Sequence, residues 1–380
     1  MTAATEQYRA ADWIGTSGQL DAGINKLAKY SCYPKEITGK TVWRTEQFAS
    51  KSDWTYVWND NEIELLEKAA RDFHQSGVPL EQISPDTFKV GEIARLLASV
   101  REEVVNGRGF ILFKGLPVDR WDRMTSAIVY LGIGTYLGNL VCQNGKGHLL
   151  GHVKNLGEDA KQTDKVRIYR TNARQFFHTD ASDIVGLLCL HRAKEGGESD
   201  IVSTHHVFNV LQNERPDVLR TLIDTDWYWD RKGEISPGQN EWFTTRVIQW
   251  LADDPSRVYL KWDPYNVKSL ERVSKAGKIP PLSEAQLEAT QVLEDICARE
   301  SLHMILEVGD IQLVANTHVL HARTSFVDAD VGPQRHLLRL WMAIPEKQGG
   351  WRVSYADSNY PRRGGIVIKG VQEKVFLEAE

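Results

Sequence analysis

The feature that most limits the fold is a series of short apolar stretches that begins near residue 165. Turn-forming residues separate the stretches, and two longer segments with helical periodicity, 207–223 and 283–301, interrupt them. The strand-like stretches are 166–169, 184–190, 224–229, 258–262, 311–316 and 336–344. Many short strands at this spacing are typical of an antiparallel barrel or sandwich, and not of a sheet built from strand–helix–strand units.

The amino-terminal part of the chain has a different pattern. Apolar residues recur at helical spacing in 61–77 and 91–107, and an apolar strand at 110–113 and a helical segment at 121–137 follow. We therefore predict an α+β fold in one domain that spans residues 1–380. Its predicted parts are a mostly helical amino-terminal region (1–106), a β-rich core with insertions (107–347) and a tail (348–380).

Charge and cysteine content narrow the class of protein. The 380 residues include 46 Lys and Arg and 51 Asp and Glu, for a formal net charge of −5. Without a concentrated basic face, binding to nucleic acid or to an anionic membrane is not expected. No apolar run approaches the roughly 20 residues that cross a bilayer. Four widely spaced cysteines predict buried free thiols and hence a cytoplasmic location: Cys32, Cys142, Cys189 and Cys297.

The glycine-rich segment 132–138 resembles a dinucleotide-binding loop. Such a loop needs a strand before its glycines and a helix after them, so that helix amides face a pyrophosphate. Here Gly132, Gly134 and Gly138 end a helical pattern, and their spacing is one residue too long. We therefore predict a helix terminus or close backbone packing at this segment instead of a nucleotide site.

The first chemical signal is the pair His178 and Asp180. In an extended strand, residues two apart project from the same face, so an imidazole and a carboxylate can converge on one cation. With 11 His and 51 acidic residues in 380, about 1.5 such pairs arise by chance. The pair therefore gains meaning only from its context. A metal site that holds Fe(II) and keeps three coordination positions open needs one more histidine.

A second segment supplies candidates for that histidine. A predicted strand at 311–316 leads into His318 and His321, and His321 is followed 14 residues later by Arg335. We prefer His321 as the third ligand and keep His318 as the competitor. A guanidinium on a neighbouring strand suits a dicarboxylate whose keto-acid end chelates the metal while its far carboxylate binds the arginine. Arg339 lies four residues further on.

Taken together, the residues resemble the TauD/TfdA family of Fe(II)- and 2-oxoglutarate-dependent dioxygenases, which includes taurine dioxygenase and clavaminate-synthase-like enzymes. The elements that carry the resemblance, in order, are the run from Tyr169 to Asp180, the turn Gly196-Gly197-Glu198-Ser199, the segment His321-Ala-Arg-Thr324, and Arg335 with Arg339. They span roughly residues 107–347. The resemblance implies a double-stranded β-helix core, jelly-roll or cupin-like, that is flanked by helices.

The resemblance also implies the cofactors and the role of each matching residue. The cofactors are Fe(II), 2-oxoglutarate as cosubstrate and O2. The iron ligands would be His178, Asp180 and His321, and Arg335 would bind the distal carboxylate of 2-oxoglutarate. Ser199 would assist the cosubstrate, although the family more often has Thr there. Arg339 matches an arginine that contacts an anionic substrate in some members and is structural in others.

The implied reaction is oxidation of a C–H bond in a small organic substrate, with release of succinate and CO2. Related halogenases replace the carboxylate ligand, so the presence of Asp180 makes hydroxylation the default, while desaturation, epoxidation and ring closure stay open. We expect a substrate that is anionic, amino-acid-derived or a natural-product intermediate. Residues 231–242 predict a loop over the site, and Gln143, Asn144, His152 and the Trp242–Phe243 pair are candidates for lining it.

Two other functions remain as alternatives at this stage. One is a non-catalytic binding or sensor protein that keeps the barrel; it would usually show a broken ligand set or lack the arginine. The other is a zinc hydrolase with the same three ligands, since zinc accepts two histidines and a carboxylate. The sequence does not determine the oligomeric state, and a homo-oligomer is one of the alternatives.

Overall fold

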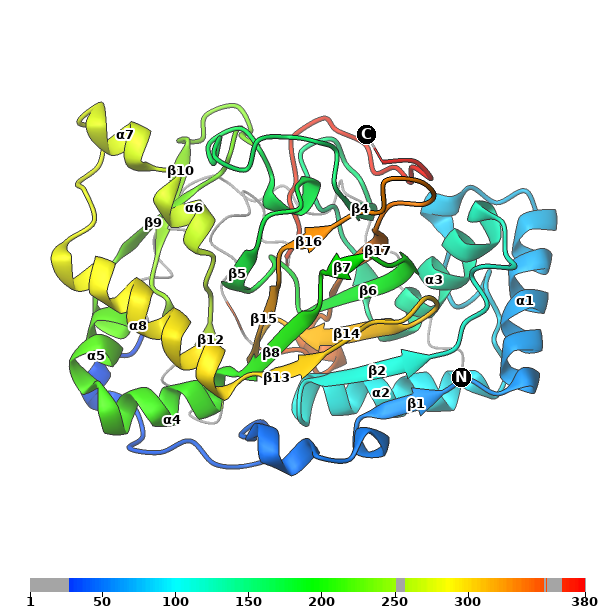
Figure 1. Ribbon diagram of the computed structural model, residues 1–380, viewed down its shortest axis with the longest axis horizontal. Helices are drawn as coiled ribbons and strands as arrows, with labels where there is room; N and C mark the ends of the chain where they lie inside the picture. Colours follow the sequence, from blue (N-terminus) through cyan, green and yellow to red (C-terminus); the bar gives the residue numbers. More distant parts are fainter. Residues whose placement is uncertain (1–26, 251–256, 352, 354–363, 380) are drawn as a thin grey trace.

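The computed structural model describes residues 27–250, 257–351, 353 and 364–379. Two β-sheets face each other, and a layer of helices covers the outer face of each (Figure 1). The predicted α+β architecture, a double-stranded β-helix flanked by helices, is confirmed. The predicted domain bounds at 1–106, 107–347 and 348–380 stay a prediction, and residues 1–26 lie outside the described part of the chain.

The helices and strands have the following bounds. The helices are α1 Asp60–Gln75, α2 Ile93–Asn106, α3 Arg123–Leu137, α4 Thr204–Glu214, α5 Pro216–Asp224, α6 Pro264–Lys268, α7 Glu271–Lys275 and α8 Glu284–Glu300. The strands are β1 Thr55–Val57, β2 Phe110–Lys114, β3 Asn139–Leu140, β4 Leu150–Lys154, β5 Gln175–His178, β6 Ile184–His191, β7 Glu195–Gly196, β8 Ser199–Ser203, β9 Trp227–Asp230, β10 Trp242–Thr245, β11 Ile248–Gln249, β12 Tyr259–Leu260, β13 Leu302–Met304, β14 Ile311–Ala315, β15 Val319–Arg323, β16 Phe326–Val327 and β17 His336–Ala343.

The larger sheet has the strand order β1-β2-β14-β6-β17-β3, with β4 also paired to β17. Its strands run antiparallel except for β1, which lies parallel to β2. Side chains alternate between its faces: Ile111 and Phe113 pack among helices α1, α2 and α3, whereas Phe110 and Leu112 pack between the sheets. This two-residue alternation lets one strand serve both hydrophobic layers.

The smaller sheet has the order β13-β8-β15-β5. The outward-facing residues Phe177, Val202 and Leu320 pack against helices α4, α5 and α8, so that the second helical layer is on this side. Their sequence neighbours, His178 and His321 among them, therefore face the space between the sheets. That space holds the candidate site.

Most predicted elements lie where they were expected, but two differ. The stretch 166–169 is not a strand, because residues Ile168–Arg170 form a 3-10 turn. The single helix predicted at 207–223 is two helices, α4 and α5, with Arg215 between them in a non-helical conformation. The reason is Pro216, which lacks the backbone N–H that a continuous helix would use and disfavours a helical conformation at the residue before it.

The glycine segment 132–138 packs closely, as predicted. Gly132 and Gly134 lie inside α3, and a Cβ atom on Gly132 would stand 2.3 Å from the Phe88 ring. All four cysteines are free thiols, but Cys32 is exposed, so the prediction of four buried thiols was wrong for this residue. Among the described residues, no helix is long and apolar enough to cross a membrane.

Candidate active site

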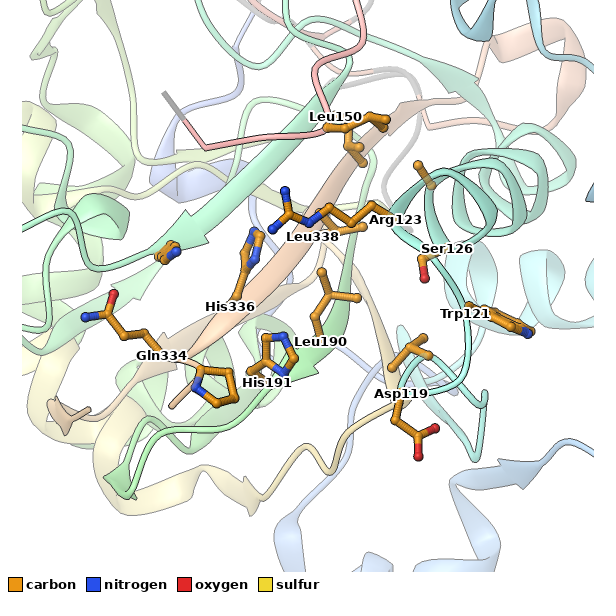
Figure 2. A pocket seen from close by; sticks show the side chains of 15 residues that line it. Asp119, Trp121, Arg123, Ser126, Leu150, Leu190, His191, Gln334, His336 and Leu338 are labelled. Carbon is orange, nitrogen blue, oxygen red and sulfur yellow. The ribbon is translucent and has the colours of Figure 1, made fainter. Parts of the chain in front are cut away.

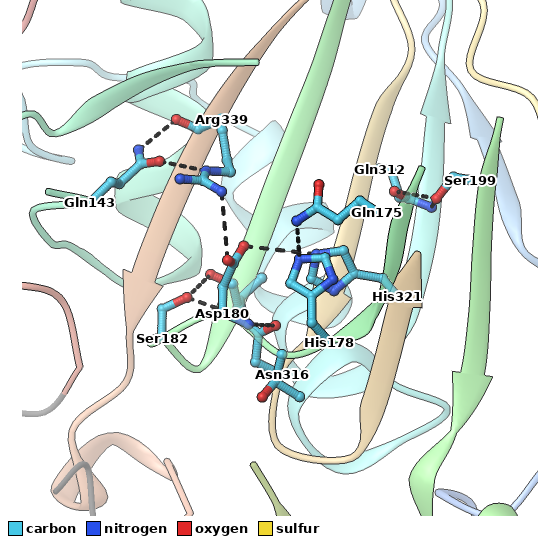
Figure 3. A network of polar contacts seen from close by, with 12 residues as sticks. Gln143, Gln175, His178, Asp180, Ser182, Ser199, Gln312, Asn316, His321 and Arg339 are labelled. Carbon is cyan, nitrogen blue, oxygen red and sulfur yellow. Dashed lines mark hydrogen bonds and ion pairs between the residues drawn. The ribbon is translucent and has the colours of Figure 1, made fainter. Parts of the chain in front are cut away.

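His178 and His321 face each other across two neighbouring strands. They are directly paired residues of β5 and β15, and their ring centroids are 4.1 Å apart. Asp180 lies beside them, and its Oδ2 atom is 3.8 Å from Nε2 of His321. One ligand atom from each of the three side chains lies within 4.8 Å of the others, and all three are buried (Figure 3). The structure thus brings together the three predicted ligands.

Asp180 reaches this position by a turn and not by strand alternation. Strand β5 ends at His178, two residues earlier, so the sequence argument from a shared strand face does not apply to the carboxylate. Instead the Asp180 amide donates a hydrogen bond to Oδ1 of Asn316, at 3.0 Å, and Asn316 donates to the Ser182 hydroxyl at 3.1 Å. The Thr179 amide donates to the Trp262 carbonyl at 2.8 Å. These contacts from distant segments hold Asp180 in place.

The protonation states suit a cation. The His178 Nδ1–H donates to the Phe176 carbonyl at 2.9 Å, so Nε2 carries a lone pair, which in this structure lies 2.8 Å from the Gln175 amide nitrogen. Burial, together with the nearby His178, lowers the pKa of His321 to about 3, so its ring is neutral. Burial alone would raise the pKa of Asp180, but Arg339 and the two histidines outweigh it, and the pKa lies below its usual range.

A divalent metal ion fits this donor set. Oδ2 of Asp180 is buried and has no hydrogen-bond partner among the described residues, which would be costly unless something else binds it. Two neutral imidazoles and one carboxylate are the donors of the open iron sites that many oxygenases share. The arrangement therefore offers a metal one carboxylate oxygen and two ring nitrogens.

His318, the competitor of His321, lies elsewhere. It is fully buried, its Nε2 is 3.2 Å from the Gly107 carbonyl, and its ring stacks on Trp351 with centroids 4.9 Å apart. Its other nitrogen pairs with the Thr317 hydroxyl at 2.9 Å. Both ring nitrogens are thus engaged in the protein core, and His318 is not part of the three-residue cluster.

A cavity that we call the Arg335 cavity extends from the three ligands. It is lined by His178, Asp180, His321, Ser199, Gln312, Arg323, Arg335 and Arg339, among others. Arg335 is buried, and one guanidinium nitrogen, Nη2, donates to the Gly197 carbonyl at 3.1 Å. The other, Nη1, has no hydrogen-bond partner among the described residues. Burial lowers the pKa of Arg335 to about 10, so it remains charged at neutral pH.

The Gly-Gly turn explains how Arg335 is accommodated. Gly197 has a φ of +76°, and a Cβ atom there would lie 2.6 Å from Nε of Arg335. Only glycine satisfies both conditions. Ser199 follows in β8, but its hydroxyl is hydrogen-bonded to the Gln312 carboxamide, at 3.1 Å from Oε1. Ser199 therefore lines the cavity together with Gln312, a residue of β14 that the sequence did not single out.

Arg339 is held rigidly next to the ligands. Its Nε donates to Oε1 of Gln143 at 2.7 Å, and Gln143 donates back to the Arg339 carbonyl at 2.7 Å. The guanidinium lies over the Tyr169 ring, 4.6 Å from its centroid, and Nη1 is 3.5 Å from Oδ1 of Asp180 (Figure 3). Arg339 is thus close to Asp180 and lines the Arg335 cavity together with Arg335.

A second cavity, which we call the loop cavity, lies on the Asp180 side of the cluster. It is lined by His178, Asp180, Gln143, Tyr169, Gln175, Phe243 and Arg339, and by basic and acidic residues that include Arg231, Lys232, Lys261 and Asp263. Arg231, Lys232 and Glu234, from the start of the loop between β9 and β10, line it; that the loop 231–242 lies over a functional site stays a prediction. A neighbouring cavity includes Asn144 and His152, so these predicted lining residues lie one cavity further out.

Sequence reasoning missed several of these residues. Gln175 is one: its amide nitrogen is 2.8 Å from Nε2 of His178. Its position three residues before His178 was the available signal. Gln312 and Asn316 had no comparable signal, because they reach the site from β14 and the turn after it. A further cavity at the start of α3, on the outer face of the larger sheet, contains none of the candidate residues (Figure 2).

Comparison with known proteins places the chain in a family. Residues 76–341 match the family described as "Taurine catabolism dioxygenase TauD, TfdA family", and the chain belongs to it. The match begins well before residue 107, where the motifs begin, so it includes α2 as well. The predicted class, a 2-oxoglutarate-dependent dioxygenase, is thereby confirmed.

Two curated relatives and two solved structures illustrate the similarity. FR-33289 synthase of Streptomyces rubellomurinus is 31% identical over 317 residues, 82% of this chain and 91% of that protein. Taurine hydroxylase-like protein SAT17 of Stachybotrys chartarum is 27% identical over 319 residues, 81% of each. Asparagine oxygenase in complex with Fe(II), 3-hydroxyasparagine and succinate has a TM-score of 0.61 at 18% identity, covering 76% of this chain and 93% of that one. The oxygenase OrfP with Fe and α-ketoglutaric acid has a TM-score of 0.57 at 14% identity, covering 80% and 98%.

Proposed function

We propose that this protein oxidises a C–H bond of a small organic substrate with Fe(II), 2-oxoglutarate and O2, and that His178, Asp180 and His321 hold the iron. The observation that carries this assignment is one shared cavity. The three ligand groups line it, and so does the buried, charged Arg335, whose Nη1 has no hydrogen-bond partner among the described residues. A zinc hydrolase would have no use for Arg335, and a binding protein no need for an intact ligand set.

When bound, the iron and 2-oxoglutarate would supply the oxidising chemistry, with succinate and CO2 as coproducts. The protein's own contribution is binding and positioning. Arg335 would bind the distal carboxylate of 2-oxoglutarate through its free Nη1 and its Nε edge. Ser199 would contact the same carboxylate, from a hydroxyl that Gln312 already orients. Arg339 keeps Asp180 ionised and in place.

The loop cavity is the proposed substrate site, because His178 and Asp180 line it and Arg335 does not. Its many charged and amide side chains favour a small polar substrate over a hydrocarbon. The solved relatives named above bind hydroxyasparagine, in one case, and (3S)-hydroxy-L-arginine, in another. We therefore propose an amino-acid-derived or otherwise anionic substrate. Hydroxylation is the default outcome, because Asp180 occupies the position that a halide would need.

The direct test is anaerobic. Fe(II) and 2-oxoglutarate added to the protein should produce the visible charge-transfer absorption of the chelate, and on admission of air the consumption of O2 should match the succinate formed. Absence of the band with the wild-type protein at saturating Fe(II) and 2-oxoglutarate would refute the proposal. We further propose that residues 1–380 form one catalytic domain and, from the free cysteines, that the protein is cytoplasmic.

A further inference from the structure

The loop cavity contains a cation that the proposed chemistry does not use. Lys232 lies in the loop between β9 and β10 and lines both the loop cavity and the neighbouring cavity that includes His152. Its ammonium makes no hydrogen bond or ion pair with any described residue. Lys232 lies over the face of the Tyr265 ring, with its Nζ atom 5.7 Å from the ring centroid. A half-buried ammonium with only this contact has lost much of its hydration.

The acidic groups of the same cavity are already engaged. Asp230 accepts hydrogen bonds from Arg272, at 2.6 Å, and from the Ser269 hydroxyl, at 2.8 Å. Glu234 is ion-paired with Arg167 and also accepts from the Gly145 amide. These carboxylates therefore form their ion pairs with Arg272 and Arg167 and not with Lys232, although their charges still act on it.

Asp263 is the remaining acid near Lys232. Its Oδ1 caps helix α6 by accepting from the amides of Tyr265, at 2.9 Å, and Asn266, at 3.3 Å. Burial lowers the pKa of Lys232, and the nearby Arg167 lowers it further, whereas the charges of Asp263, Asp230 and Glu234 oppose both effects without cancelling them. The ammonium thus remains in an environment that does not fully compensate its charge.

The backbone holds Lys232 in this position at a cost. Its φ of +49° makes it the one non-glycine residue with a positive φ among those that the structure describes. The Lys232 amide donates to Oδ1 of Asp230 at 2.8 Å, and Asp230 is itself fixed by Arg272 and Ser269. A lysine in the left-handed region is less favourable than glycine, because its Cβ crowds the backbone there. The next residue, Gly233, also has a positive φ, so the loop has glycine at one of these two left-handed positions and lysine at the other.

We propose that Lys232 is a specificity-determining residue that binds an anionic group of the substrate, a carboxylate, phosphonate or sulfonate, in the loop cavity. The substrate is then an acid whose charged group lies near the β9–β10 loop while another of its carbons faces the His178–Asp180–His321 cluster. This inference rests on the proposed function and specifies its substrate class. Lys232 touches the substrate and not the cosubstrate, because it lines the loop cavity and is not among the residues of the Arg335 cavity.

The test uses the anaerobic complex of the full-length protein with Fe(II) and saturating 2-oxoglutarate. The probes are butyrate, propylphosphonate and 1-propanesulfonate, with butyramide as the neutral control, and binding is read from the shift of the chelate absorption. At least one anion should bind more tightly than butyramide. Lys232→Met should weaken its binding about tenfold or more, because a charged contact is lost, and Lys232→Arg should restore part of it. The three anions distinguish carboxylate from phosphonate and sulfonate.

Two controls make the outcome unambiguous. Lys165→Met removes an exposed lysine that lines neither cavity and should leave probe binding unchanged. The dissociation constant of 2-oxoglutarate should be the same in Lys232→Met and the wild type. If the chelate band forms but no anion is preferred over butyramide, or if Lys232→Met binds the anions as well as the wild type, this inference is wrong while the proposed function stands. If the band never forms, it is the proposed function that fails.

Discussion

Replacing Arg335 with methionine tests the cosubstrate site most directly. Arg335 is 6% exposed and lines the cavity shared with the three-residue cluster; Nη2 is bonded to Gly197, and Nη1 has no hydrogen-bond partner among the described residues. Loss of a buried, two-pronged contact to a carboxylate costs about 2–4 kcal/mol. Because about 1.4 kcal/mol corresponds to a factor of ten, the dissociation constant of 2-oxoglutarate should rise by about 30-fold to about 1,000-fold.

The cosubstrate itself supplies the matching change. In 2-oxopentanoate a methyl group replaces the distal carboxylate, while the keto-acid end that chelates the metal is unchanged. The wild type should bind 2-oxopentanoate more weakly than 2-oxoglutarate by a factor similar to the effect of Arg335→Met. The variant should scarcely distinguish the two compounds, because the partner of the carboxylate is gone.

Both affinities can be measured by anaerobic titration of the Fe(II)-loaded protein, using the chelate absorption. Arg192→Met, which removes an exposed arginine paired with Glu307, is the control and should behave as the wild type. If Arg335→Met still prefers 2-oxoglutarate as strongly as the wild type does, the distal carboxylate binds elsewhere, and Arg323 or Arg339 becomes the candidate.

Three further predictions concern the ligands, the glycine turn and the buried histidines. His321→Ala should abolish 2-oxoglutarate turnover and His318→Ala should leave much of it; activity in the first and not in the second would reverse the ligand assignment. Gly197→Ala should weaken 2-oxoglutarate binding, because the added Cβ would displace the Arg335 side chain. Gly91→Ala is the control. Gly91 also has a positive φ, but nothing lies within 4 Å of the added Cβ, so this change should only lower the melting temperature. Burial lowers the pKa of His205 to about 4 and of His318 to about 3. Below pH 6.5 the unfolded chain therefore binds protons at these two residues that the folded chain does not bind. The free energy of unfolding should fall by up to about 1.4 kcal/mol per pH unit for each histidine, until the pH reaches its folded-state pKa. Urea unfolding between pH 7 and pH 5 measures this slope, and a flat profile would contradict it.

The order and spacing of residues along the chain were sufficient for several conclusions. Short apolar runs separated by turn residues predicted an antiparallel β core, because a short run followed by a turn can form a strand and reverse the chain. The motif order from His178 to Arg335 pointed to the family and to the three ligands, and the Gly196-Gly197 turn belongs to the same signal. The apolar runs and the glycine turn are local features, whereas the order of the motifs pointed to the ligands through the family resemblance and not through a shared strand face.

Other features depended on contacts between segments far apart in sequence. Asp180 is positioned by Asn316 and not by the strand of His178, and Gln143 is 196 residues from the Arg339 side chain that it holds. The preference for His321 over His318 gains its geometric support only from the pairing of β5 with β15, which places His321 opposite His178. Sequence spacing carries no information about contacts between such distant residues. The register of the strands and the path of the loops are decided by how the hydrophobic faces of the two sheets pack together.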